Sequence, residues 1–401
     1  MRREVILSTY SECSLENARR ARRPLHGTQN GRKRIIGMLA GLQDPALMAD
    51  KAAEEEALRR AVGDPAPWDD VARSLDVWKR HFVRHNLLEG GRAFSGRLFG
   101  IARTLVRLAD ETEKPNAERL REYRDSNLDS LKFRLFSPAP IYRDLETVGL
   151  GDSLGLFMEL AGADDQLVRR VMAGRSPHER AADLVARCRL DDVAVRRKLA
   201  DGGRKAIRDS ADPMIRLALL VDTAARQVRK IDEEQVAEPQ RQAYARIARA
   251  QFQALGDRVY PDATFTLRLA FGTVRGYEQS GEQIALWTTL GGAYRHAAAH
   301  GNREPFRMPP RWLQRKERLD LNTPFNFVCT TDITGGNSGS PVVNRQGELV
   351  GIVFDGNRHA FVWDFAYTDT QARCVSVHSA GIMESLRKVY DAKELVDELG
   401  R

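Results

Sequence analysis

Apolar residues recur at three- and four-residue steps through most of the chain before Pro261. Leu98, Ile101, Leu105 and Leu108 show this pattern clearly. The spacing places their side chains on one face of an α-helix. Repeated along the chain, it predicts about eight to ten amphipathic helices with no internal repeat of fixed period.

Two helix starts are marked by capping residues. Asp212 precedes Pro213, and an aspartate followed by proline at the first helical position is a common N-cap arrangement. Ser176 and Glu179 have the spacing of a capping box. Segments rich in glycine and proline at 63–67, 137–140 and 202–203 are expected to separate helices.

After Pro261 the period of the apolar residues changes to two. Phe265, Leu267, Leu269 and Phe271 alternate with polar or smaller residues, which predicts a half-buried strand over 264–271.

Further strands and a helical tail follow this segment. Residues 324–331 read as extended, and 341–344 and 349–354 predict two strands joined by a turn at 345–348. The C-terminal tail returns to a helical period. The fold class expected is therefore multi-domain α+β, in which an α-helical domain is followed by an antiparallel β domain with a helical tail. We expect a helix or linker over 1–27, the helical domain over 28–258 and the β domain over 259–401.

Composition and charge exclude several classes of protein. The chain has 401 residues, 42% of them hydrophobic, and its net charge is +8. These values argue against a disordered chain, a collagen-like repeat or a small disulfide scaffold. No apolar run approaches the ~18 residues of a membrane span. Arg19, Arg20, Arg22 and Arg23 form the sharpest basic cluster, but acidic residues are interspersed throughout, so a solvated surface is favoured over nucleic-acid binding.

The cysteines and histidines do not indicate a metal site. Four widely spaced cysteines, without a CxxC motif, favour free thiols over one or two disulfides. His296 and His300 are one helical turn apart, which suits either a metal pair or a surface helix. The surface helix is favoured because no HExxH glutamate lies between them. We expect no metal and no organic cofactor.

A glycine-rich segment at 331–343 carries the candidate chemistry. Its sequence is Thr-Asp-Ile-Thr-Gly-Gly-Asn-Ser-Gly-Ser-Pro-Val-Val, and it presents Ser338 between two predicted strands. Glycines permit positive φ and close approach of a substrate. The same turn aims backbone N–H groups, here those of Gly336 and Ser338, at the oxyanion of a tetrahedral intermediate. The alternative is a hairpin loop without chemistry.

The wider sequence around Ser338 resembles the nucleophile loop of chymotrypsin-like serine peptidases. More specifically, it resembles the dipeptidyl-peptidase 7 and 11 family, serine peptidase family 46. Three blocks carry this resemblance: 331–357 with Asp-Gly-Asn at its end, 261–277 beginning Pro-Asp-Ala-Thr-Phe, and Asn-Gly-Arg-Lys at 30–33 with Gly37 and Gly41 following. The likeness spans most of the chain.

The resemblance implies a role for each matching residue. Ser338 matches the nucleophile. Asp355 and Asn30 match the residues that bind the free α-amino group of the peptide. Gly356 matches the position that shapes the S1 pocket, where glycine accompanies apolar or uncharged P1 residues. From the residues alone, Asp355 also suits a turn cap and Asn30 a helix N-cap.

A serine nucleophile needs a base and an orienting acid, and in this family both lie N-terminal to the helical domain. Here the helical domain begins near the start of the chain, and no histidine occupies the family's position. The chain therefore resembles the C-terminal portion of a longer, chymotrypsin-like double-barrel peptidase, without the half that carries histidine and aspartate. The family implies a periplasmic, cell-surface or secreted protein. This sequence has no signal peptide, so the chain as written would be cytoplasmic.

The function expected is that of a serine-type dipeptidyl-peptidase, a hydrolase releasing dipeptides with an apolar or uncharged P1 residue. Its partner is a peptide with a free N-terminus, with no nucleic acid involved, and a homodimer is left open. The alternative function is an inactive remnant that binds peptide N-termini.

Overall fold

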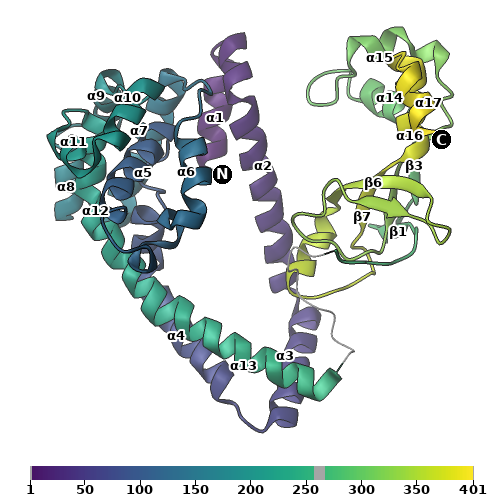
Figure 1. Ribbon diagram of the computed structural model, residues 1–401. Coiled ribbons are helices and arrows are strands. Elements are labelled where there is room, and N and C mark those ends of the chain that lie inside the picture. The colour runs from purple at the N-terminus through teal and green to yellow at the C-terminus, as the bar shows by residue number, and fades with distance from the viewer. Residues whose placement is uncertain (1, 257–266, 401) are drawn as a thin grey trace. The chain divides into compact units, whose positions relative to one another are not determined.

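The computed structural model of the protein describes residues 2–256 and 267–400 (Figure 1). Of these, residues 2–29 and 58–256 form one compact unit, and residues 30–57 and 267–400 form a second. Both are described separately below as unit 1 and unit 2. Together they make an α+β protein, as expected. Residues 30–57 belong to unit 2 although they fall inside the expected helical domain, and the domain limits stay a prediction.

Unit 1 is built from helices. Its elements are α1 (Arg2–Glu12), the first part of α2 (Leu15–Leu42), the end of α3 (Pro45–Val62), α4 (Ala66–Leu88), α5 (Arg97–Glu111), η1 (Asn116–Glu118), η2 (Arg121–Tyr123), α6 (Asp125–Leu135), α7 (Arg143–Ala161), α8 (Gln166–Met172), α9 (Pro177–Arg187), α10 (Val193–Asp201), α11 (Gly203–Asp209), α12 (Pro213–Asp232), η3 (Glu233–Ala237) and α13 (Glu238–Leu255).

The local signals in this region are confirmed. Leu98, Leu105 and Leu108 are buried on one face of α5. The Asp212 carboxylate caps α12, and Ser176 forms the capping box at the start of α9. The expected number of helices is wrong, because α1 to α13 lie within the described part of this region. Short helices such as α8, α10 and α11 are the reason, since each offers too few turns to show a period.

The core of unit 1 is one continuous apolar cluster. It joins α5 to α12 and α7 to α9, and fully buried members include Leu154, Leu184 and Ile215. The long helices α4 and α13 lie side by side (Figure 1) and are connected to the core through α12. Each Å² of apolar surface removed from water stabilises the fold by about 25 cal/mol. A cluster of this size is therefore the main source of stability for unit 1.

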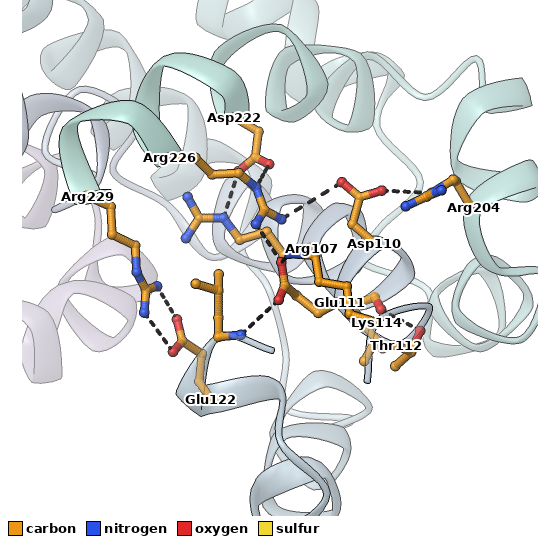
Figure 2. A network of polar contacts seen from close by, with 12 residues as sticks. Arg107, Asp110, Glu111, Thr112, Lys114, Glu122, Arg204, Asp222, Arg226 and Arg229 are labelled. Carbon is orange, nitrogen blue, oxygen red and sulfur yellow. Dashed lines mark hydrogen bonds and ion pairs between the residues drawn. The ribbon is translucent and has the colours of Figure 1, made fainter. Parts of the chain in front are cut away.

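Charged residues of α5, of α12 and of the turn after α4 form a network beside this core, and Figure 2 shows its members on α5 and α12. Arg107 pairs with Asp222 at 2.7 Å and with Glu89 at 2.6 Å. Arg226 pairs with Asp222 at 2.6 Å and with Glu111 at 2.5 Å. The Glu111 side chain is fully buried. Buried charges are tolerable only when paired and hydrogen-bonded, so this network ties the helices into one arrangement.

Unit 2 contains the strands. Its elements are the remainder of α2 and α3, β1 (Tyr277–Gln279), β2 (Glu282–Ile284), β3 (Trp287–Thr289), α14 (Leu290–Ala299), α15 (Pro310–Gln314), η5 (Lys316–Arg318), β4 (Pro324–Cys329), β5 (Pro341–Val343), β6 (Leu349–Gly356), η6 (Arg358–Asp364), β7 (Cys374–His378), α16 (Ser379–Glu384), η7 (Ser385–Val389) and α17 (Lys393–Leu399).

Five of these strands form an antiparallel sheet in the order β3-β4-β7-β6-β5, and β1 pairs with β2 in a separate hairpin. The strands expected within 324–331, 341–344 and 349–354 are confirmed as β4, β5 and β6. The tail is helical as expected, with the π-helical turn η7 between α16 and α17.

The strand expected over 264–271 is wrong where it can be assessed. Residues 261–266 lie outside the described residues, and 267–271 are not in a strand. Leu267, Leu269 and Phe271 are each more than four-fifths exposed. Alternation alone does not satisfy backbone donors and acceptors, and here the pairing with β4 begins only at Val274, opposite Cys329.

Candidate active site

Ser338 lies in the loop between β4 and β5, and two successive turns shape this loop. Backbone hydrogen bonds join Asn337 N–H to Thr334 O and Ser340 N–H to Asn337 O. Gly336 and Gly339 have φ of 110° and 91°, the region that favours glycine. Gly339 N–H donates to Val353 O at 2.7 Å, which fixes the loop to β6. Gly336 and Gly339 are therefore suited to this loop conformation.

The Ser338 side chain is exposed and points toward β6. Its hydroxyl donates to Phe354 O at 3.4 Å. Phe354 is the residue before Asp355, so the structure brings Ser338 and the carboxylate-bearing end of β6 together. Gly336 is also exposed in this loop. The joint role of its amide and that of Ser338 as an oxyanion hole stays a prediction.

Asp355 is placed by an irregularity in the sheet. The register between β6 and β7 shifts between Val353 and Asp355. Such a bulge adds a residue to one strand and redirects side chains, and here both Phe354 and Asp355 are exposed. The Asp355 carboxylate accepts a hydrogen bond from Gly356 N–H at 2.8 Å. This contact is the one that the turn-cap alternative expects, and the Asp355 side chain stays exposed.

Gly356 lies against both the nucleophile loop and the segment after β6. A Cβ atom here would lie 3.0 Å from Ala360 Cβ and 3.6 Å from Ile333 Cδ1. Ile333 belongs to the glycine-rich segment that carries Ser338. Gly356 is therefore closely packed between the segment after β6 and the serine loop, and a larger residue would crowd Ala360.

Sequence reasoning missed two residues that hold this region in place. The Asn357 side chain accepts from the N–H groups of Ala360 and Arg373, both at 3.1 Å, and donates to Gln371 O at 2.7 Å. Arg373 is 1% exposed, and its guanidinium donates to backbone carbonyls that include Gly276 O and Asp369 O. Desolvation lowers the pKa of Arg373. Asn357 stands in a quoted motif, but nothing local to Arg373 signals its role.

Asn30 lies in the interior of α2 and is exposed. The N-cap alternative is therefore wrong. Helical spacing places Asn30, Gly37 and Gly41 on one face of α2. Added Cβ atoms at Gly37 and Gly41 would lie 2.6 Å from Phe361 Cδ2 and 2.4 Å from Val362 Cγ1, so η6 packs directly on this face.

An ion pair reinforces that packing. Arg34, one turn after Asn30, pairs with Asp364 of η6 at 2.6 Å. The structure thus places the helix of Asn30 against the segment that follows Asp355 and Gly356. All five predicted site residues belong to unit 2.

The histidines of unit 2 have partners other than Ser338. His359 Nε2 lies 3.2 Å from Gln279 Oε1, and His378 Nδ1 accepts from Ala380 N–H at 3.1 Å. Burial lowers the pKa of both imidazoles, which favours their neutral form. The ring of His296 meets the ring of Phe306 edge to face, and the ring of His300 lies tilted against it.

Two classes of feature are absent from the described residues. Within 2–256 and 267–400, no helix has the length and apolar character to cross a membrane. In the same ranges, no group of three or more histidine, cysteine or acidic side chains is arranged to hold a metal ion.

One protein family matches the whole chain. The model described as Peptidase S46 matches residues 1–401. The chain belongs to the peptidase S46 family. Its relatives include the Asp/Glu-specific dipeptidyl-peptidase of Shewanella putrefaciens, 29% identical over 92% of this chain and 56% of the relative. Dipeptidyl-peptidase 7 of Phocaeicola vulgatus is 34% identical over 35% of this chain and 20% of the relative.

A solved S46 structure has the same fold. The crystal structure of Porphyromonas endodontalis DPP11 in complex with the dipeptide Arg-Glu matches with a TM-score of 0.76 and 20% identity, covering 100% of this chain and 59% of that one. The chain thus spans little more than half the length of this structure and of the Shewanella relative.

Proposed function

We propose that this S46 chain carries the nucleophile and the substrate-binding residues of a serine dipeptidyl-peptidase. One observation carries the proposal. The exposed Ser338 hydroxyl, on a glycine-shaped loop, lies 3.4 Å from the carbonyl that precedes Asp355. A nucleophile and a carboxylate at the surface of one sheet are what an enzyme needs to cleave a peptide at a fixed distance from its free amino group.

In the proposed reaction, Ser338 Oγ attacks the carbonyl of the second residue of the peptide. The amides of Gly336 and Ser338 stabilise the oxyanion, the remainder of the peptide leaves, and water releases the dipeptide from the acyl-enzyme. A general base must take the serine proton in this step. The sheet of unit 2 would then be part of a chymotrypsin-like catalytic domain. An extracytoplasmic location follows from the family resemblance alone.

Recognition of the amino terminus is assigned to Asp355 and Asn30. A carboxylate binds an ammonium through a charge-assisted hydrogen bond, and an amide oxygen supplies a neutral acceptor. Packing of α2 on η6 supports this pairing, because it orients the Asn30 face toward the segment after Asp355.

Gly356 is proposed to shape the pocket for the P1 side chain. It borders the serine loop through Ile333 and adds no positive charge, which favours apolar or uncharged residues. The relatives include both an Asp/Glu-specific enzyme and dipeptidyl-peptidase 7. A panel of dipeptidyl substrates that differ only at P1 decides between these preferences. Faster release after Asp or Glu contradicts the assignment.

The nucleophile is tested by labelling the purified chain with a fluorophosphonate probe. We expect a single adduct on Ser338, lost in Ser338→Ala and kept in Ser340→Ala, a control from the same loop. The same preparations are assayed for dipeptide release. A chain that is folded but neither labelled nor active contradicts the peptidase proposal and favours an inactive remnant that binds peptide N-termini.

A further inference from the structure

Two buried thiols face each other across strands β4 and β7. Cys329 and Cys374 are register partners, 4% and 0% exposed, and both are free. They form a small buried cluster with Val353. Opposite residues in an antiparallel pair have Cα atoms about 4.5 or about 5.5 Å apart. Both separations fall within the roughly 4.4–6.8 Å that a disulfide spans.

The surroundings make the two sulfur atoms chemically unequal. Cys329 Sγ lies 3.3 Å from the Thr331 hydroxyl oxygen. Hydrogen bonds from the Cys374 thiol and from Thr331 lower the pKa of Cys329 against the effect of burial, and the charge of Arg373 acts in the same direction. The pKa of Cys374 is raised by its interaction with Cys329 and by burial. Cys329 is therefore the nucleophilic member of the pair.

The other two cysteines do not share this setting. Cys188 is buried in the core of unit 1, where desolvation raises its pKa to about 12. Cys13 is exposed on the turn after α1. They serve as internal controls, Cys188 for a single buried thiol and Cys13 for a single exposed thiol.

We propose that Cys329 and Cys374 are a reversible redox pair that closes a disulfide between β4 and β7 when the protein meets a peroxide. The Cys329 thiolate attacks one oxygen of hydrogen peroxide, which gives a sulfenic acid and releases hydroxide. The Cys374 sulfur then attacks the sulfenic sulfur, and a second water leaves. Overall, two thiols lose two electrons and two protons, and one peroxide becomes two waters. A thiol reductant reverses the reaction by exchange.

The bond would lie next to the candidate site. Cys374 pairs with Gly356 across β6 and β7, and Cys329 precedes the segment that carries Ser338. The cross-link closes a loop of chain from 329 to 374 that includes Ser338, Asp355 and Gly356. Closing such a loop restricts the unfolded chain and stabilises unit 2. The chemistry of the pair does not depend on the proposed peptidase function.

The test uses the full chain and hydrogen peroxide. Reduced protein is oxidised, remaining thiols are alkylated, and tryptic peptides are analysed by mass spectrometry without reduction. Trypsin places Cys329 in peptide 319–345 and Cys374 in peptide 374–387. We expect the two peptides joined, two hydrogens lighter than their sum, with Cys188 still alkylated. Dithiothreitol should separate them.

Two variants sharpen the result. In Cys374→Ser the sulfenic acid of Cys329 has no resolving thiol, so dimedone should trap it there and not at Cys188. Hydrogen exchange of unit 2 amides should slow several-fold on oxidation of the wild type and not of Cys329→Ser. Absence of the joined peptide at peroxide levels that oxidise Cys13, or joining of either cysteine to Cys13 or Cys188 instead, overturns the proposal. Both readouts are independent of fluorophosphonate labelling.

Discussion

The two units of the chain differ in how their interiors are built. Unit 1 buries 34 apolar residues in one cluster, whereas the two clusters described in unit 2 have four and three buried members. Unit 1 also encloses an ionic network beside its core. All candidate site residues lie in unit 2. Function is therefore assigned to the unit with the smaller interior, as is common for regions that bind ligands and move.

The difference between the two interiors is tested by truncating one fully buried leucine in each unit, Leu154 in unit 1 and Leu290 in unit 2. We expect Leu154→Ala to cost about 4–5 kcal/mol and Leu290→Ala about 2–3 kcal/mol, because a smaller cluster relaxes more easily around a cavity. Hydrogen exchange, followed separately in each unit, measures both. Equal losses would mean that the units are equally well packed.

The next largest loss of stability is expected from breaking the ionic network of unit 1. Glu111→Ala removes the partner of Arg226 and of Leu120 N–H, and breaking a buried pair costs about 3–5 kcal/mol. The control is Glu113→Ala. Glu113 pairs with Arg204 at the surface, which is worth at most about 1 kcal/mol. Urea denaturation read from unit 1 amides distinguishes them. Similar losses for both variants contradict a structural role for the buried network.

Packing of α2 on η6 is tested with two glycines of the same helix. Gly41→Ala places a Cβ 2.4 Å from Val362 Cγ1, and such overpacking costs about 1–3 kcal/mol. Gly31→Ala meets no atom within 4 Å and should stabilise the helix by up to about 1 kcal/mol. Peptide binding should weaken in Gly41→Ala alone. Unchanged peptide binding by Gly41→Ala would contradict a role for Asn30 in the site.

The smallest effect is a dependence on pH. Burial alone raises the pKa of Glu111, but hydrogen bonds from Lys114, Leu120 N–H and Arg226 outweigh it, so the pKa is lowered on folding. The resulting stability is fully present above the unfolded pKa of about 4.3 and is lost as the pH falls through the folded value. Unfolding of unit 1 between pH 6 and pH 3 should therefore be steeper in wild type than in Glu111→Gln. Parallel curves for the two proteins would contradict the assigned pKa shift.

Local signals predicted much of this structure. The α5 face, the caps at Ser176 and Asp212 and the β5–β6 hairpin all follow from residues within a few positions of each other. The same holds for the Ser338 loop, whose glycines are visible in the sequence.

Features set by distant contacts were not predictable. The burial of Arg373 among backbone carbonyls and the bulge before Asp355 depend on neighbouring strands. Residues 267–271 have the alternating apolar pattern of a strand but do not form one. α2 continues through Pro24, where a local rule would end a helix, and this continuation places Asn30 in the helix interior.

The central claim is that Ser338 attacks a peptide whose amino end is held by Asp355. The most direct measurement compares the rate at which two dipeptidyl phosphonate probes label Ser338, one with a free α-amino group and one acetylated. A charge-assisted hydrogen bond of about 1.5–3 kcal/mol predicts labelling about 10- to 100-fold faster with the free amine. Asp355→Asn retains an oxygen acceptor for Gly356 N–H and should abolish most of that preference. Equal rates for the two probes, or a preference unchanged in Asp355→Asn, would contradict the account.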